Sequence, residues 1–390
     1  MGKEHTSSIA MAENRRREAL NDAIDAAIHT QRIVGCVVLA AENGRIVFQR
    51  AAGQADREER SAMTIDTPFR FASLTKLVTT MAALRLAASG RLSPANPVSL
   101  YLPQFALRMA SGEAASPTIS QLMAHTAGLD YRFQQPADGA YAQAGISDGL
   151  DDAVISLSEN IRRIASVALE YPPGSAWRYS VATDVLGAVI ESVTGQPLDQ
   201  AVAELVTIPL GLDAQFQWQA DELATPYFDS KPAPRRMTGV TNVPLPFVEG
   251  PGVCFHPARI ERKNAWFSGG AGMAGRAGDV LTLLEAFRAG DFLGEEWRAA
   301  ARAPRIGEEA QAQGPGWGYS WMGAALLDPA KANSRWSRGS VSWGGVYGAW
   351  WGIDFARNLS VVALTNTAFE GMIGQFTRDI AAAAIEGALP

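Results

Sequence analysis

The beginning of the chain changes from a helical pattern of apolar positions to a strand-like one. Residues 14–30 are charged and rich in alanine, with apolar positions close to helical spacing, which predicts a helix. Two β-rich runs follow within residues 33–53, on either side of Asn43-Gly44. Because Asn-Gly favours the tight turns that join antiparallel strands, these runs predict a hairpin.

The end of the chain mirrors its beginning. Residues 340–354 and 359–368 have the composition of strands, and residues 376–389 have the apolar spacing of a closing helix. We therefore expect an α+β protein whose antiparallel sheet is flanked by N- and C-terminal helices. Residues 1–80 and 266–390 are expected to form this domain from both chain ends.

The middle of the chain is dominated by helical segments. Residues 74–90 and 180–195 both predict helices that end at a glycine. Pro- and Gly-rich stretches near 209–252 and 303–318 predict loops, because such residues do not continue a regular element. We expect residues 81–265 to form an inserted, mostly helical domain, with the active cleft between it and the sheet.

Size and composition narrow the class of protein. The chain has 390 residues, of which 47% are hydrophobic and 19% charged, so it can form two folded units with ample cores. Its net charge of −6 and its lack of a basic, aromatic-rich run argue against a nucleic-acid partner. We see no signal peptide, no apolar run of about 18 residues and only two cysteines, which together predict a cytoplasmic protein with no membrane span.

Candidate chemistry begins at Ser73 and Lys76, three residues apart at the start of a predicted helix. That spacing places both side chains on one helical face. A serine hydroxyl needs a base to become a nucleophile, and a desolvated lysine can serve once it has lost its proton. Ser-x-x-Lys also arises by chance in a chain of this length. The pair alone therefore does not exclude a purely structural role for Ser73.

Tyr179 is the second candidate. It follows the turn-forming segment PPGSAW and precedes the helix predicted in residues 180–195, a placement that can aim a phenol into a cleft. A phenol close to a lysine and a serine can pass a proton between them. Taken alone, a tyrosine packed at the start of a helix is the commoner arrangement.

The third candidate is Trp343-Gly344-Gly345-Val346, within a predicted C-terminal strand. The two glycines remove side chains, so a substrate can lie against the backbone. The N–H groups of Val346 and Ser73 are then candidates for an oxyanion hole, which holds the negative oxygen of a tetrahedral intermediate. The structural alternative is a sheet bend beside a packed tryptophan.

In this order and with these separations, the three motifs resemble the serine β-lactamase and penicillin-recognising superfamily, and most closely the family VIII carboxylesterases with a class C β-lactamase-like fold. The resemblance covers most of the chain and includes the segments HTAGLDY, SGGAGM, GPGWGY and LTNTAFEGM. It implies a β-lactamase/DD-peptidase-like fold. It also implies that Ser73 is the nucleophile, Lys76 its base partner, Tyr179 the tyrosine of the second motif and Val346 an oxyanion donor.

Two departures from the β-lactamase pattern bear on the substrate. Val181 stands where a β-lactamase has asparagine, and Trp343-Gly344-Gly345 replaces Lys-Thr-Gly. The chain thus lacks an amide for the antibiotic side chain and a cation for its carboxylate. We therefore expect a small-molecule, uncharged carboxylic ester with a short to medium acyl chain, and no cofactor.

Other residues complete the expected site. We expect Trp343, Gly344, Gly345 and Tyr131 to bind substrate. His125, at a predicted helix end, is expected to fix a turn rather than to act in catalysis. The other three histidines show no metal-ligand spacing with carboxylates or cysteines, so no metal is expected.

Together these features predict a serine hydrolase that forms an acyl-enzyme on Ser73. Lys76 and Tyr179 are expected to pass the serine proton to the leaving alcohol, and water then releases the acid. The alternatives on the same fold are a β-lactamase or D-amino-acid peptidase, an amidase, and an acyltransferase. An inactive binding protein of the superfamily is the alternative outside enzymes. The sequence carries no signal for the oligomeric state.

Overall fold

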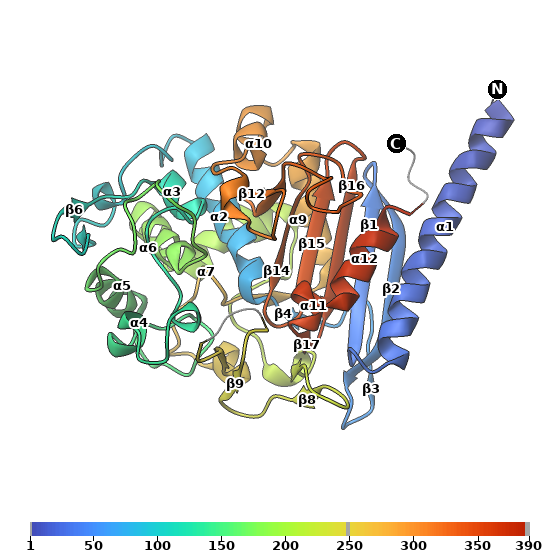
Figure 1. Cartoon of the computed structure of the whole chain (residues 1–390), viewed down its shortest axis with the longest axis horizontal. Helices are drawn as coiled ribbons and strands as arrows, with labels where there is room; N and C mark the ends of the chain where they lie inside the picture. The colour runs from blue at the N-terminus through green and yellow to red at the C-terminus, as the bar shows by residue number, and fades with distance from the viewer. Residues whose placement is uncertain (1, 247–249, 387–390) are drawn as a thin grey trace.

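A computed structural model describes residues 2–246 and 250–386 of the chain, in which a broad antiparallel sheet stands beside a helical region (Figure 1). The sheet has the strand order β12-β13-β14-β15-β16-β1-β2-β3, and its strands pair antiparallel throughout. Its strands are β1 (Gly35–Glu42), β2 (Arg45–Asp56), β3 (Ser61–Ala62), β12 (Trp317–Tyr319), β13 (Ala324–Leu326), β14 (Val341–Gly345), β15 (Ala349–Asp354) and β16 (Leu359–Thr365). This confirms the predicted α+β class and its antiparallel sheet.

The two chain ends meet in the middle of this sheet. Strand β1 pairs with β16, from Cys36 opposite Thr365 to Glu42 opposite Leu359. On its other side β1 pairs with β2, and the turn between them contains Gly44 with a φ of 79°. The predicted N-terminal hairpin and the joint sheet of both chain ends are therefore confirmed.

Helices cover both faces of the sheet. On one face lie α1 (Gly2–His29) and α12 (Gln375–Ala384), which share an apolar cluster with β1 and β16 (Figure 1). On the other face, α9 (Ala277–Ala289) packs on β1 and β16. The predicted N- and C-terminal flanking helices are thus present, although residues 387–389 of the closing helix lie outside the described residues.

Seven α-helices and one π-helix lie between residues 71 and 210. They are α2 (Thr75–Ala88), α3 (Ile119–Met123), α4 (Ala140–Gln143), α5 (Leu157–Ala165), α6 (Ala182–Thr194), α7 (Leu198–Val202), the π-helix η4 (Ala203–Thr207) and α8 (Ile208–Leu210). Helix α2 runs without a break past residue 80, so the predicted domain limit falls inside a helix, which is one cooperative unit. The division of the chain into two domains otherwise stays a prediction.

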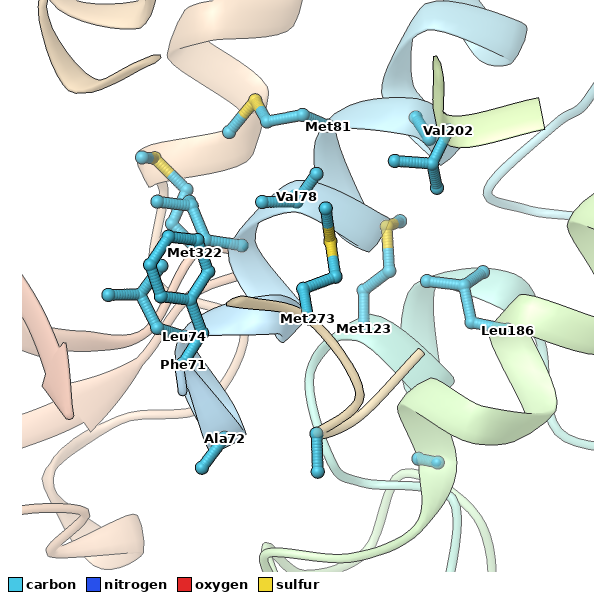
Figure 2. Packing of buried hydrophobic residues seen from close by; sticks show 14 of the residues in the cluster. Phe71, Ala72, Leu74, Val78, Met81, Met123, Leu186, Val202, Met273 and Met322 are labelled. Carbon is cyan, nitrogen blue, oxygen red and sulfur yellow. The ribbon is translucent and has the colours of Figure 1, made fainter. Parts of the chain in front are cut away.

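Helix α2 is the central helix of the molecule. Twelve of its 14 residues are buried, and an apolar helix that is covered all round is typical of a core. The packed side chains around it include Phe71, Leu74, Val78, Met81, Met123, Leu186, Val202, Met273 and Met322 (Figure 2). A helix held in this way gives the residues at its N-terminus a rigid support.

Short strands, 3-10 turns and two C-terminal helices complete the described chain. The strands are β4 (Phe69–Arg70), β5 (Leu107–Arg108), β6 (Ala114–Ala115), β7 (Tyr227–Phe228), β8 (Arg235–Arg236), β9 (Thr241–Val243), β10 (Val253–Phe255), β11 (Ala274–Gly275) and β17 (Thr367–Ala368). The 3-10 turns are η1 (Ala72–Leu74), η2 (Val98–Leu100), η3 (Arg132–Gln134), η5 (Ala220–Glu222), η6 (Pro257–Glu261) and η7 (Glu308–Ala310), and the helices are α10 (Glu295–Arg302) and α11 (Glu370–Ile373). Where the structure describes the Pro- and Gly-rich stretches predicted as loops, they hold only such short elements.

Two further properties concern membranes and metals. Among the described residues, no helix is both long and apolar enough to cross a membrane. Within the same part of the chain, no three His, Cys, Asp or Glu side chains gather as they would around a metal ion. Cys36 is buried, Cys254 is half-buried, and both are free thiols.

Candidate active site

Ser73 lies in the 3-10 turn that leads from β4 into α2. Ala72, directly before it, has a φ of 45°, which is unusual for a residue with a side chain and turns the backbone sharply. The N–H of Phe71 donates to the carbonyl of Met273 at 2.9 Å, which ties this turn to the strand pair β4 and β11. Ser73 is 7% exposed, and its hydroxyl stands at the positive N-terminal end of α2.

Lys76 reaches back from the first turn of α2 to this serine. Its Nζ lies 3.2 Å from Ser73 Oγ and donates to the carbonyl of Gly270 at 2.7 Å. The same ammonium group faces the rings of Tyr179 and Tyr131, 4.7 and 5.2 Å from their centres. The structure therefore brings together Ser73 and Lys76, which the sequence paired by their spacing alone. Lys76 is only 5% exposed.

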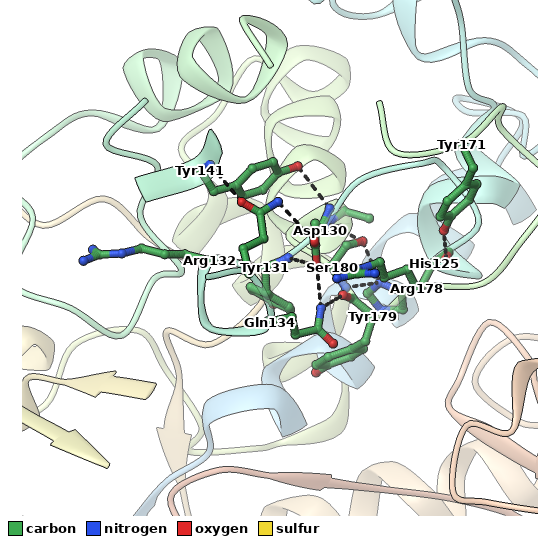
Figure 3. Close-up of polar contacts among 12 residues, drawn as sticks. His125, Asp130, Tyr131, Arg132, Gln134, Tyr141, Tyr171, Arg178, Tyr179 and Ser180 are labelled. Atoms are coloured by element: carbon green, nitrogen blue, oxygen red, sulfur yellow. Dashed lines mark hydrogen bonds and ion pairs between the residues drawn. The ribbon is translucent and has the colours of Figure 1, made fainter. Parts of the chain in front are cut away.

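A polar network built on Asp130 holds the segment that carries Tyr179 (Figure 3). Asp130 is fully buried, and its carboxylate accepts hydrogen bonds from the N–H of Tyr131 at 2.7 Å and from Gln134 Nε2 at 2.8 Å. Gln134 Nε2 also donates to the carbonyl of Tyr179 at 2.6 Å. Arg178, beside Tyr179, forms a 2.8 Å ion pair with Asp130, so the backbone at Tyr179 is fixed from both sides.

Three aromatic rings surround the Tyr179 phenol. Its ring centre lies 4.8 Å from that of His125, 5.0 Å from that of Trp343 and 5.2 Å from that of Tyr131. Trp343 Nε1 also donates to the Tyr179 hydroxyl at 3.2 Å. This indole N–H stabilises negative charge on the phenol oxygen whenever that oxygen gives up its proton. The candidate from the third motif thus contacts the candidate from the second.

His125 fixes the turn around Tyr179, as expected. The N–H of Ser180 donates to His125 Nδ1 at 3.2 Å, and the carbonyl of His125 accepts from the N–H of Arg178 at 3.0 Å. Burial, and secondarily the charge of Lys76, lower the pKa of His125 well below its ordinary value. A neutral ring with Nδ1 as acceptor matches these contacts.

The glycines of the third motif let β14 pass directly against the Ser73 turn. A side chain at Gly345 would collide with the carbonyl of Phe71 and place its Cβ 3.3 Å from the Ser73 nitrogen. A Cβ added at Gly344 would lie 2.7 Å from the Cγ atom of Met372. Both glycines thus serve packing within the protein, and their contact with substrate stays a prediction. Val346, the next residue, is buried, and its oxyanion role stays a prediction as well.

Asp184 is a site residue that sequence reasoning missed. It lies in α6, is fully buried, and accepts hydrogen bonds from Ser268 Oγ at 2.6 Å and from the N–H of Gly270 at 3.0 Å. Burial raises the pKa of Asp184, whereas Ser268, the Lys76 charge and Gly270 act to lower it. The available signal was a carboxylate in the predicted helix of residues 180–195, whose other acidic residue is Glu191.

Residues 268–270 form a loop that α2 and α6 hold from opposite sides. Lys76 and Thr79 of α2 donate to the carbonyls of Gly270 and Gly269, the latter bond being 2.8 Å long. Added Cβ atoms at Gly269 and Gly270 would lie 2.8 Å from the Thr183 carbonyl and from Asp184 Oδ2. Only glycine fits at such an approach, which explains the SGGAGM segment physically.

Sequence reasoning also passed over a second serine, in Gly145-Ile146-Ser147-Asp148-Gly149. These residues match the Gly-x-Ser-x-Gly pattern of α/β-hydrolases, in which the serine stands exposed on a strand-to-helix turn. Here Ser147 is fully buried in a loop, and its hydroxyl donates to Asp151 Oδ1 at 2.6 Å. The geometry therefore gives this serine a structural role.

The fold and the site together indicate a protein family, and comparisons with known proteins identify it. The family model described as Beta-lactamase matches residues 20–385, and the chain belongs to this family. Within it, the chain is 47% identical to Esterase EstB from Burkholderia gladioli, over 92% of both chains. It also matches the solved structure of EstCE1, a hydrolase with promiscuous acyltransferase activity, with a TM-score of 0.94 and 41% identity over 96% of this chain and 99% of that one.

A more distant structure shares the fold alone. The class C β-lactamase from Rhodobacter sphaeroides matches with a TM-score of 0.65 and 21% identity, over 93% of this chain and 98% of that chain. The predicted resemblance to the β-lactamase superfamily, and the class C β-lactamase-like fold that it implied, are therefore confirmed.

Proposed function

We propose that this protein is a serine carboxylesterase of the family VIII type, which cleaves uncharged small-molecule esters through an acyl-enzyme on Ser73. The observation that carries the proposal is the buried contact between Lys76 Nζ and Ser73 Oγ, 3.2 Å apart at the N-terminus of α2. The names of EstB and EstCE1, an esterase and a hydrolase, support the reaction class. The two free thiols agree with the predicted cytoplasmic location.

The proposed acylation uses three side chains. Ser73 Oγ attacks the ester carbonyl carbon while its proton passes to the pair formed by Lys76 and Tyr179. The tetrahedral intermediate then collapses, the bond to the alcohol oxygen breaks, and that oxygen takes the proton from Tyr179. Trp343 supports this step because its indole N–H already donates to the Tyr179 hydroxyl.

Deacylation repeats the same proton transfers with water. A water molecule gives a proton to the pair and attacks the acyl carbon, and Ser73 recovers its proton as the acid leaves. In both steps the N–H groups of Ser73 and Val346 are the proposed oxyanion donors, each worth about 3–4 kcal/mol in comparable sites. The approach of Gly345 to the Ser73 nitrogen supports this placement.

Transfer of the acyl group to an alcohol is a second candidate function. It is supported by EstCE1, which is described as a hydrolase with promiscuous acyltransferase activity. The two functions share the acyl-enzyme and differ only in the nucleophile that removes the acyl group. Added methanol would reveal transfer as methyl ester formed in place of acid.

A substrate panel tests the proposal. Steady-state rates are measured for a short aryl ester, a long-chain ester, a cephalosporin and a linear amide, with the wild-type protein and with Ser73→Ala. We expect the short ester to be the best substrate and Ser73→Ala to remove its turnover, because only the nucleophilic oxygen is lost. Turnover retained in Ser73→Ala, or a wild-type preference for the amide or the cephalosporin, would contradict the proposal.

A further inference from the structure

A pocket beside the Ser73 turn is lined by an unusual set of basic side chains. Its walls include Arg70, Arg259 and Arg262 together with His256. Arg70 and Arg259 are each 8% exposed, and burial lowers the pKa of both guanidinium groups. Three arginines at one pocket are a concentrated positive charge in a protein whose net charge is −6.

Within the part of the chain that the structure describes, these arginines have no carboxylate at close range, and Glu261 acts on Arg70 only at longer range. Among residues 2–246 and 250–386, no ion pair within 4.0 Å involves Arg70, Arg259 or Arg262. The carboxylates of Asp151 and Asp184 act on Arg259 only at longer range. A buried charge without a counter-ion is costly, so this pocket is suited to an anion.

Backbone carbonyls fix the three guanidinium groups in place. Arg70 donates to the carbonyl of Pro257 at 3.0 Å, Arg259 to that of Trp266 at 3.0 Å, and Arg262 to that of Asp152 at 3.0 Å. Each bond satisfies an N–H group, but a carbonyl is neutral and does not balance the positive charge of the side chain. The arginines are therefore held ready for a ligand with little further ordering.

The segments that form the active site continue along the chain into the walls of the pocket. Arg70 is three residues before Ser73, and Tyr347, also in the wall, follows Val346. The wall also includes residues 271–273, directly after the Gly270 carbonyl that binds Lys76. Neither Tyr179 nor Trp343, which face the proposed leaving alcohol, lines it. We therefore assign this pocket to the acyl side of the ester, opposite the proposed leaving alcohol.

We propose that this pocket binds a carboxylate at the far end of the acyl chain, so that the enzyme takes half-esters of dicarboxylic acids as well as uncharged esters. This inference rests on the proposed esterase function. Guanidinium groups bind carboxylates in a bidentate manner, and the apolar side chains of Phe216, Trp266 and Phe267 in the same wall suit the intervening methylene groups. Trp343 offers no cation, so an anionic ester must find its positive partner elsewhere.

Pairs of isosteric substrates test this inference. The values of kcat/KM are compared for monoethyl succinate and ethyl butyrate, monoethyl glutarate and ethyl pentanoate, and monoethyl adipate and ethyl hexanoate, by pH-stat titration. The two members of a pair differ only at the far end of the acyl chain, where one has a carboxylate and the other a methyl group. We expect the half-ester to be the better substrate by about tenfold at one chain length, the effect of one charge-assisted hydrogen bond.

Variants of the partly exposed Arg262 connect that preference to the pocket. Arg262→Gln should lower the ratio of half-ester to neutral ester by about tenfold or more, and Arg262→Lys should lower it less because the charge remains. Arg91→Gln, an exposed arginine outside the pocket, is the matched control and should leave the ratio unchanged.

The outcomes separate this inference from the proposed function. If neutral esters are hydrolysed but the half-ester is the poorer substrate at all three lengths, the anion site is wrong and the esterase stands. The same follows if Arg262→Gln leaves the ratio unchanged. If neither kind of ester is hydrolysed, both the proposed function and this inference are wrong.

Discussion

Lys76 is the residue on which the proposed chemistry depends, and its surroundings show how a buried amine is held. It donates to one carbonyl, faces two aromatic rings and touches the serine oxygen. The carbonyl belongs to Gly270, whose N–H is in turn bound by Asp184. Asp184 is therefore a positioning residue that acts through the 268–270 loop, and the nearby Lys76 charge acts to lower its pKa against the larger effect of burial.

The effect of Asp184→Asn follows from these contacts. The amide keeps an acceptor for Ser268 and Gly270 but removes the negative charge, so we expect kcat on a short ester to fall by about ten- to a hundredfold. The substrate does not touch Asp184, so KM should change by less than about threefold. Ser268→Ala, which removes only a neutral donor to the same carboxylate, is the control and should have the smaller effect. A kcat within a factor of two of wild type in Asp184→Asn would remove Asp184 from the account.

Contacts between neighbours in the chain were predictable, whereas contacts between distant segments were not. Ser73 and Lys76 are three residues apart, and helical geometry alone brings them together. Asp184 and Gly270 are 86 residues apart, and no periodicity in either segment indicates their contact. Ser147 shows that a local pattern can also be misleading, because its five-residue segment resembles a nucleophile elbow while the fold buries its hydroxyl.

At the scale of elements, the short strand β14 sets the chemistry of one wall of the site. Its glycines let the strand approach the Ser73 turn, and its tryptophan hydrogen-bonds to Tyr179. The sequence indicated an apolar wall at Trp343, but the hydrogen bond to the phenol depends on the placement of α6 and its preceding loop. The same residue therefore bears on both substrate choice and proton transfer.

Trp343→Lys tests the part of this wall in substrate choice. A lysine supplies the cation that a β-lactam carboxylate needs, so the ratio of cephalosporin to ester kcat/KM should rise by about ten- to a hundredfold, even as ester turnover falls. Trp343→Phe loses the indole donor without adding a charge, so its ratio should not rise. Steady-state kinetics on one ester and one cephalosporin measure both. If the ratio of cephalosporin to ester kcat/KM is equal in the two variants, other loops determine the choice of substrate.

His125, which fixes the turn around Tyr179, makes the stability of the protein depend on pH. Because the pKa of His125 is lowered by burial and by Lys76, the unfolded chain binds a proton below about pH 6.5 that the folded chain does not. The free energy of unfolding should therefore fall as the pH drops below that value, by up to about 1.4 kcal/mol per pH unit.

Comparison with His125→Gln isolates this effect. Burial raises the pKa of Asp148 to about 8 and that of Asp229 to about 7, so these carboxyls bind protons in the folded state and favour stability at lower pH. Their contribution cancels between the two proteins. Urea unfolding at several pH values should show a steeper acid loss in wild type than in His125→Gln, while the exposed His29→Gln should match wild type. Parallel curves for wild type and His125→Gln would contradict the buried neutral ring.

For the whole molecule, the predicted sheet from both chain ends was correct because its strands and hairpin turn have strong local patterns. The predicted limit at residue 80 falls inside α2, and the division into two domains stays a prediction. Four segments that are far apart in sequence converge at the site: residues 73–76, 179–184, 268–270 and 343–346. Such convergence is a property of tertiary packing, which a single sequence pattern does not contain.

If Ser73 carries the acyl group during turnover, mass spectrometry of the acid-quenched enzyme can detect that group on the Ser73 side chain. The protein is mixed with an activated short-chain aryl ester, quenched within the first turnovers and digested. We expect an acyl adduct on the peptide that contains Ser73, present in wild type and in Ser147→Ala and absent in Ser73→Ala. An adduct on the Ser147 peptide, or an acylated Ser73→Ala protein that still turns over ester, would contradict it.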